Sequence, residues 1–285
     1  MDLLEPLFLL RVAISFVAAS AVVASASVIA ERYGPRRGGV IATLPSTLVV
    51  STLFMGFNQG EAFVAEAAVQ IPVMMGANSL FLALYVLAIP LGMWGAGLVA
   101  LASWALIAAV FLTWPSPNVG FSVLLFTALT LGSFWWLNKK TPAHLPSIKI
   151  QYTPLQVAAR GLLAGTVVAS ALVLARIGGP VWGGVFTPAP AIFLSTMWIL
   201  HRSQGARFAS SMARSMCLAG FIPMLYAVVV ALSFVAFGMF WATLLAYGLA
   251  IPAAVAVSKI LKRLAKPAVG EKQEAVAAAP PIAAK

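Results

Sequence analysis

The sequence predicts an all-α, polytopic membrane protein of about nine transmembrane helices, built as two inverted four-helix repeats joined by a linker helix. Three observations lead to this fold class. The chain is 62% hydrophobic and only 9% charged, with a mean hydropathy of +0.99, which indicates lipid as the surrounding solvent. Its apolar segments are long enough to cross a bilayer. Its first half also matches its second half when the two are aligned with an offset of 145 residues.

Nine apolar segments approach or exceed the roughly 20 residues that a membrane-spanning helix needs. We expect the first to be a retained helix, because Asp2 and Glu5 stand where a signal peptide carries positive charge. The third and eighth are long for a straight span, and Pro72 and Pro223 are candidate kinks within them. The segments are residues 7–31, 38–57, 62–89, 92–114, 119–138, 155–176, 183–200, 207–235 and 238–260.

The distribution of basic residues predicts the orientation. With the N-terminus outside, 15 of the 18 Lys and Arg residues fall on one side of the membrane, which the positive-inside rule assigns to the cytoplasm. The sequence therefore predicts a multi-pass cell-membrane protein with its N-terminus outside and its C-terminus in the cytoplasm. The Ala-, Pro- and charge-rich tail, residues 264–285, is expected to be a disordered cytoplasmic segment.

The internal repeat has 16 identities in 42 ungapped columns, which indicates a duplication. An odd number of helices per repeat period makes the second copy enter the membrane upside down. Loop charges agree with this inversion, because Arg36 and Arg37 in a cytoplasmic loop become Val181 and Trp182 in its external counterpart. The expected units are a first repeat at residues 1–118, a linker helix at 119–138 and a second, inverted repeat at 139–263.

Two stretches, GGVIATLPSTLVVSTLFMGFNQGEAF and GGVFTPAPAIFLSTMWILHRSQGARF, each combine a small-residue run, a proline in the second helix and a polar loop with glycine. In these features the chain resembles the small four-helix inner-membrane proteins of the GlpM type and their uncharacterised relatives. The resemblance covers each repeat and implies a four-helix fold unit. It implies no established activity and no catalytic or binding residues. This chain departs from the family by fusing two units, which implies that single-unit relatives pair antiparallel.

Inverted repeats built around a broken helix are typical of secondary transporters, which bind substrate near the midplane at the repeat interface. The candidate broken elements are the second and seventh helices, where prolines remove backbone donors and hydroxyl groups are concentrated. An alternative is that these small and hydroxyl residues only allow close helix packing. The candidate substrate-binding residues here are Thr43, Pro45, Ser46, Thr47, Ser51, Thr187, Pro190 and Ser195.

Polar residues within spans add three further candidates. Glu66 lies about five residues into the third helix and Arg214 seven residues into the eighth, and an inverted arrangement would let their charges approach each other. We therefore expect a pair that lines a cavity, for proton coupling or substrate binding. The alternatives are a purely structural pair, or an interfacial Glu66 with Arg214 extending to the membrane surface. Gln70 is a further candidate, or an interhelical hydrogen-bond partner.

Several function classes receive no support from the sequence. The net charge of +11 comes from loop residues that orient helices, so no nucleic-acid partner is predicted. No catalytic motif or metal-ligand spacing is present, so no enzymatic activity, cofactor or metal is predicted. The expected partners are membrane lipids and a small-molecule solute, and the oligomeric state stays open. Two functions remain: a small secondary transporter or permease for a neutral or anionic solute, working by alternating access, and a non-transporting assembly or scaffold subunit.

Overall fold

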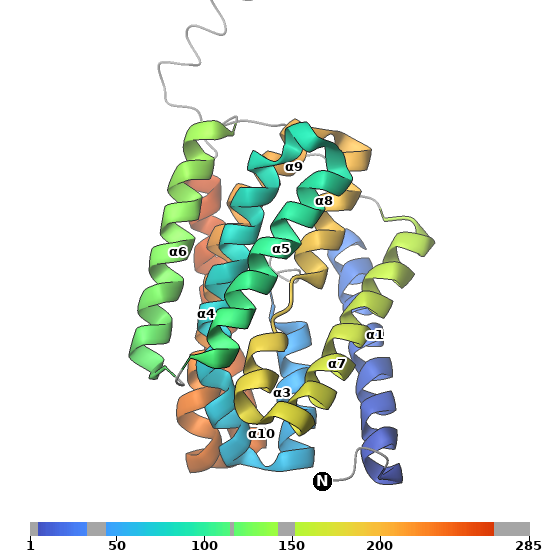
Figure 1. The fold of residues 1–285 in the computed structure, drawn as a ribbon, viewed down its shortest axis with the longest axis vertical. Coiled ribbons are helices and arrows are strands. Elements are labelled where there is room, and N and C mark those ends of the chain that lie inside the picture. The colour runs from blue at the N-terminus through green and yellow to red at the C-terminus, as the bar shows by residue number, and fades with distance from the viewer. Residues whose placement is uncertain (1–4, 33–43, 115–116, 142–151, 265–285) are drawn as a thin grey trace, which may run out of the picture.

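The described part of the chain is a bundle of α-helices without a β-strand (Figure 1). The computed structural model describes residues 5–32, 44–114, 117–141 and 152–264. The all-α prediction is therefore confirmed. Large apolar side chains such as Leu98, Leu106 and Leu124 are exposed on the outside of the bundle, as in a protein surrounded by lipid.

The first half of the chain crosses the bundle repeatedly, with ends called lower and upper as in Figure 1. Helix α1 (Pro6–Arg32) rises from the lower to the upper end, and α3 (Ser46–Gln59) descends through the lower half. Helix α4 (Glu61–Leu87) then rises through the centre. A short 3-10 turn, η1 (Ile89–Leu91), leads into α5 (Gly92–Thr113), which descends.

The second half begins with α6 (Val119–Lys140), which rises along the edge of the bundle. Helix α7 (Pro154–Phe186) descends beside α1, and α8 (Ala191–Gln204) rises through the upper half. Helix α9 (Ala206–Ala219) starts at the upper end. Helix α10 (Phe221–Leu264) descends, reverses direction and rises again.

Glycines mark the sharp bends of the long helices. Gly179 in α7 (φ 78°, ψ −166°) and Gly238 in α10 (φ 75°, ψ 156°) adopt positive φ values, which residues with a Cβ rarely tolerate. Gly238 lies where the sequence predicts the boundary between its last two spans. Pro72 lies within α4 without ending it, whereas the eighth predicted span breaks at Gly220, three residues before Pro223.

Among the described residues, six helical stretches are long and apolar enough to cross a membrane, so the prediction of nine separate spans is not confirmed. Two predicted spans, the second and the seventh, contain only short helices. Helices α3 and α8 have 14 residues each, or about 21 Å, which is shorter than a hydrocarbon core of about 30 Å. Residues 38–43 of the second predicted span lie outside the described residues. The six stretches are Pro6–Ile29, Glu61–Leu87, Ile89–Thr113, Val119–Lys140, Pro154–Phe186 and Ala206–Leu261, the last of which contains both α9 and α10.

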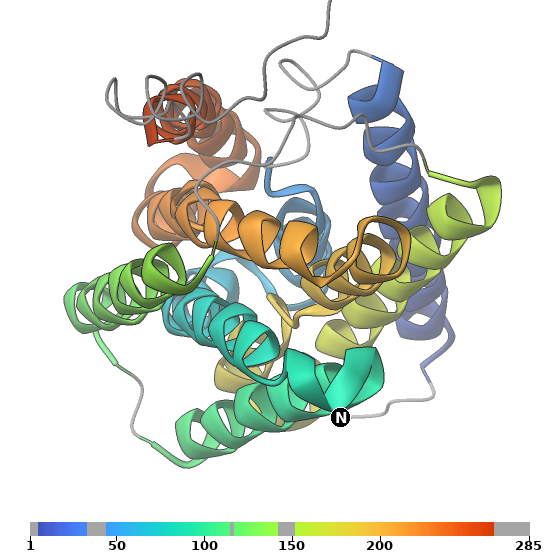
Figure 2. The ribbon, with the colours of Figure 1, turned by 90° about the horizontal axis from the view of Figure 1, so that it is seen from above.

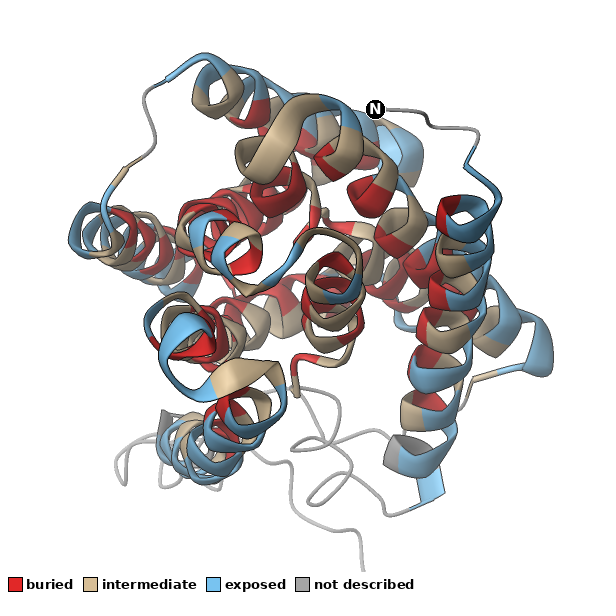
Figure 3. Ribbon diagram, turned by 90° about the horizontal axis from the view of Figure 1, so that it is seen from below, coloured by how far each residue is buried: buried red, intermediate tan, exposed pale blue. Residues whose placement is uncertain are grey.

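Helix α4 is the centre of the bundle. It packs against α5, α6, α7 and α10, which surround it when the bundle is seen along its long axis (Figure 2). Burial follows this arrangement: buried residues face inward and exposed ones outward (Figure 3). The side chains of Ile71, Phe81 and Tyr85 on α4 are completely or almost completely buried. The polar residues Gln70, Asn78 and Ser79 on α4 are likewise buried, so they are enclosed by protein and not by lipid.

Equivalent segments of the two sequence copies fold in the same way locally. Helices α3 and α8 coincide at the offset of 145 residues and run in opposite directions (Figure 1). Each ends at a glycine with nearly the same backbone angles, Gly60 (φ 89°, ψ 168°) and Gly205 (φ 84°, ψ 170°). Helices α1 and α7 are also equivalent, and they pack antiparallel. Their approach is close, because a Cβ on Gly161 would lie 2.8 Å from the Ser20 carbonyl oxygen.

Candidate functional site

The break between α7 and α8 lies against the central helix. Prolines 188 and 190 have no N–H to donate, and the chain leaves helical structure from Thr187 to Pro190. The carbonyl oxygen of Pro188 accepts a 2.8 Å hydrogen bond from the side-chain amide of Asn78 on α4. Just before the break, Gly184 packs so closely on α4 that a Cβ there would collide with the Ala67 carbonyl oxygen. The break is thus fixed to α4 at both ends.

Several buried polar atoms of α3 and α4 have no partner among the described residues. Both amide atoms of Gln70, the Oδ1 of Asn78 and the hydroxyl of Ser51 are buried and form no hydrogen bond. Gln70 also lies beside Gly184, since a Cβ on that glycine would be 2.8 Å from the Gln70 Cβ. An unpaired buried polar group costs about 1–3 kcal/mol. These atoms therefore have hydrogen-bonding capacity for a solute or water molecule.

The second predicted broken element begins at Pro45. This residue is buried and precedes the first turn of α3, where the Val49 N–H bonds to the Pro45 carbonyl oxygen over 3.1 Å. Ser46 and Thr47 are half-buried in that turn, whereas Ser51 is completely buried one turn further on. The candidate Thr43 lies outside the described residues.

The candidates of the second copy are buried as well. The Thr187 hydroxyl donates to the Gly183 carbonyl oxygen over 2.7 Å, and the Ser195 hydroxyl donates to that of Ile192 over 3.1 Å. Pro190 is buried at the start of α8. These two hydroxyl groups therefore donate to nearby backbone carbonyl groups, as is common for serine and threonine in helices.

The expected contact between Glu66 and Arg214 is not formed in this structure. Glu66 is exposed on α4, five residues above its lower end. Arg214 is buried on α9 in the upper half, where its Nη1 donates to the Asn138 Oδ1 over 3.2 Å. The two residues enter from opposite ends of a bundle whose central helix is about 40 Å long. The two charges therefore lie in opposite halves of the bundle and do not pair.

Sequence reasoning missed the role of Arg160. Its position near the start of a predicted span suggested an orienting loop charge, but it is only 9% exposed and donates a 2.6 Å hydrogen bond to Thr196 on α8. Thr196 was also not among the candidates. Thr196 lies next to Ser195 and one helical turn before Leu200, and nothing in this sequence pattern marks it as a contact of Arg160. Only the packing of α7 on α8 brings the two residues together.

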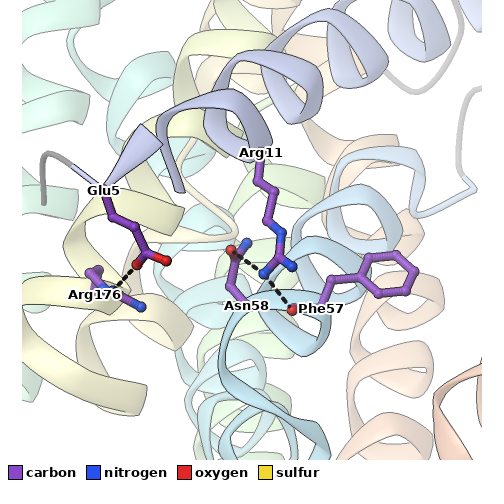
Figure 4. A network of polar contacts seen from close by, with 5 residues as sticks. All are labelled: Glu5, Arg11, Phe57, Asn58 and Arg176. Atoms are coloured by element: carbon purple, nitrogen blue, oxygen red, sulfur yellow. Dashed lines mark hydrogen bonds and ion pairs between the residues drawn. The ribbon is translucent and has the colours of Figure 1, made fainter. Parts of the chain in front are cut away.

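A polar network joins three helices at the lower end (Figure 4). Arg176 of α7 forms a 3.0 Å ion pair with Glu5, just before α1. Arg11 of α1 donates to the Phe57 carbonyl oxygen over 2.9 Å and to the Asn58 Oδ1 over 3.2 Å, at the end of α3. A cation at a helix C-terminus also interacts favourably with the helix dipole. This network therefore attaches both α3 and α7 to α1.

The described residues contain no group of three or more His, Cys, Asp or Glu side chains placed to hold a metal ion. Comparison of the chain with protein-family models, curated proteins and solved structures gives no match. Functional inference therefore rests on the geometry of the bundle itself.

Proposed function

We propose that this integral membrane protein is a small secondary transporter or permease, in which two inverted four-helix units, residues 1–118 and 139–263, alternate access to a site on α4. The solute is small and either neutral or anionic. The observation that carries the proposal is the set of unpaired polar atoms on Gln70 and Asn78, which the buried central helix presents to the break between α7 and α8.

The arrangement of α3 and α8 supports the inverted relationship. Both helices have 14 residues, both start after a proline, and both end at a glycine with positive φ, yet one occupies the lower half and the other the upper half of the bundle. Half-helices that enter from opposite sides are the recurring plan of transporters with inverted repeats. The same proposal includes the resemblance to the GlpM-type proteins. In it, the chain consists of two such four-helix units that are fused and oppositely oriented.

The depth of the polar atoms supports a solute site near the midplane. Gln70 is the tenth residue of α4 and Asn78 the eighteenth, so they lie about 14 Å and 26 Å from the start of a helix about 40 Å long. They therefore lie on either side of its midpoint. Amide groups donate and accept hydrogen bonds without carrying charge, which fits a neutral polar solute.

Orientation follows from the basic residues. Arg32, Lys139, Lys140, Arg202 and Arg207 lie on helix ends at the upper end of the bundle, whereas Arg11 and Arg176 lie near the lower end. The positive-inside rule then assigns the upper end to the cytoplasm and the N-terminus to the outside.

A non-transporting assembly or scaffold subunit is the second candidate, and close packing favours it. Gly161 and Gly165 of α7 lie against backbone carbonyl groups of α1, and Gly184 lies against the backbone of α4. Interfaces of this kind resist the sliding that alternating access requires.

A liposome assay distinguishes the two functions. We would reconstitute the protein in phosphatidylcholine liposomes and follow the entry of glycerol, urea and sodium lactate by stopped-flow light scattering. The proposal expects faster entry of at least one solute than in empty liposomes, and loss of this increase in Gln70→Leu. The control Gln204→Leu changes an exposed glutamine at the end of α8 and should keep the increase. Entry at the rate of empty liposomes for all three solutes, with folded protein, would favour the scaffold function.

A further inference from the structure

Arg160 is a buried cation in the wall between α7 and α8. It is the seventh residue of α7, about 9 Å along the helix from its upper end, and only 9% exposed. Its Nη1 donates to the Thr196 Oγ1 over 2.6 Å, and its guanidinium carbon lies 5.1 Å from the centre of the Tyr152 ring. Its Nε is buried and has no hydrogen-bond partner among the described residues.

No carboxylate of the described residues forms an ion pair with Arg160. Glu5 pairs with Arg176, Glu61 accepts a 2.8 Å hydrogen bond from the Met239 N–H, and Glu66 is exposed on α4. A charge taken out of water is costly unless an opposite charge and hydrogen bonds compensate for it. The contacts with Thr196 and Tyr152 supply one hydrogen bond and an aromatic face, but no negative charge.

The Thr196 hydroxyl also has an unused donor. Most serine and threonine hydroxyls in these helices donate to a carbonyl group three or four residues earlier, as that of Ser195 does. The Thr196 oxygen instead accepts from Arg160, and the described residues include no acceptor for its own proton. The hydroxyl O–H of Thr196 and the Nε–H of Arg160, two residues in direct contact, are therefore both donors without an acceptor among the described residues.

We infer that Arg160 and Thr196 form a binding site for an oxyanion, a carboxylate or phosphate group, between α7 and α8 at the upper end of the bundle. The guanidinium supplies the opposite charge and the Nε donor, and the Thr196 hydroxyl supplies a second donor. The oxyanion belongs to a small soluble ion or to the phosphate of a lipid headgroup. The inference does not depend on transport, because a static scaffold with a buried cation needs the same counter-charge.

The first repeat provides an internal comparison. The positions equivalent to Arg160 and Thr196 are Ser15 and Ser51, at the same offset of 145 residues. Ser15 donates to the Val12 carbonyl oxygen over 2.7 Å, and neither serine carries charge. The site is therefore expected only at the upper end. The matched control for Thr196→Ala is Ser203→Ala, which removes an exposed hydroxyl of α8 that donates to the Ile199 carbonyl oxygen.

The test uses the purified full chain in dodecyl maltoside micelles, which contain no phosphate, and measures the midpoint of thermal unfolding. One arm adds sodium phosphate, against sodium chloride of equal ionic strength. The other arm adds phosphatidylglycerol to the micelles, against diacylglycerol with the same acyl chains. We expect a rise of about 2–4 °C in at least one arm. A rise in the first arm identifies a soluble oxyanion, and a rise in the second arm alone identifies a lipid headgroup.

The variants decide whether the rise comes from this site. Arg160→Gln and Thr196→Ala should reduce or abolish it. Ser203→Ala and Arg202→Gln, which change an exposed hydroxyl and an exposed cation on α8, should keep it. If Arg160→Gln does not fold, Thr196→Ala carries the test, since it retains the cation. No rise in either arm, or an equal rise in Thr196→Ala and the wild type, would overturn the inference.

Discussion

The side-chain amide of Asn78 donates a 2.8 Å hydrogen bond to the carbonyl oxygen of Pro188. The two residues are 110 positions apart, one on the central helix of the first half and the other in the break of the second half. A break in a membrane helix leaves carbonyl groups without their helical donors, and such groups must be satisfied inside the protein. Asn78 does this for Pro188, so the break depends on a side chain that lies far away in the sequence.

Replacing Asn78 by Leu should destabilise the protein. Leucine fills a similar volume but leaves the Pro188 carbonyl oxygen buried without this donor, which costs about 1–3 kcal/mol. The measurement is the midpoint of thermal unfolding in detergent, with Ser103→Ala as control, because the Ser103 hydroxyl donates only to the carbonyl of Ala100 in its own helix. Equal midpoints for Asn78→Leu and the wild type would show that the bond contributes nothing to stability.

Replacing Gln70 by Leu should have the opposite effect on stability. Both amide atoms of Gln70 are buried without a hydrogen-bond partner, so their removal relieves an uncompensated cost of about 1–3 kcal/mol. The expected result is an unfolding midpoint equal to or above that of the wild type, measured by the same thermal scan. A marked decrease would mean that the amide is satisfied within the protein and has a structural role.

A methyl group at Gly184 should disrupt the contact between α7 and α4. A Cβ there would collide with the Ala67 backbone carbonyl, which is fixed in a continuous helix and has little freedom to move. We expect Gly184→Ala to lower the yield of folded protein sharply in size-exclusion chromatography. Gly132→Ala on α6 is the control, because its Cβ meets nothing within 4 Å. Normal yield of both variants would contradict this packing.

Labelling from outside the cell tests the inversion. Gly60 and Gly205 are equivalent turns, but their positive φ would strain a cysteine, so exposed Ala62 and its repeat equivalent Arg207 are better positions. In a Cys217→Ala background, a membrane-impermeant thiol reagent applied to intact cells should label Ala62→Cys and leave Arg207→Cys unlabelled. After permeabilisation both should react. Labelling of both in intact cells would indicate parallel repeats.

Local features of the sequence anticipated much of the secondary structure. The predicted boundary at residues 235–238 coincides with the bend at Gly238. Pro45 and Pro190, named in the candidate broken elements, directly precede α3 and α8. These features depend on interactions between neighbours in the chain, such as proline without a donor or glycine at positive φ. Such local interactions can be recognised in a single sequence.

Side-chain partnerships were predicted poorly. The sequence analysis predicted a pair between Glu66 and Arg214 because both are rare charges within spans. In the structure they lie in opposite halves of the bundle. The buried contact that exists, between Arg160 and Thr196, involves a residue interpreted as a loop cation and a residue that was not singled out. The sequence shows which residues are unusual within an apolar span. It does not show how each helix is rotated about its axis, and that rotation decides which side chains meet.

The sequence by itself determined that the chain is helical and apolar and that the helix is interrupted near Pro45 and Pro190, because these properties follow from hydropathy and backbone chemistry within short stretches. Only the tertiary structure decided that α4 is the enclosed centre and that Gln70 and Asn78 meet the break. It also decided that Arg160 is buried at Thr196. In an almost uniformly apolar helix, hydropathy does not distinguish a lipid-facing side from a protein-facing side, so helix packing alone settles which polar groups are enclosed.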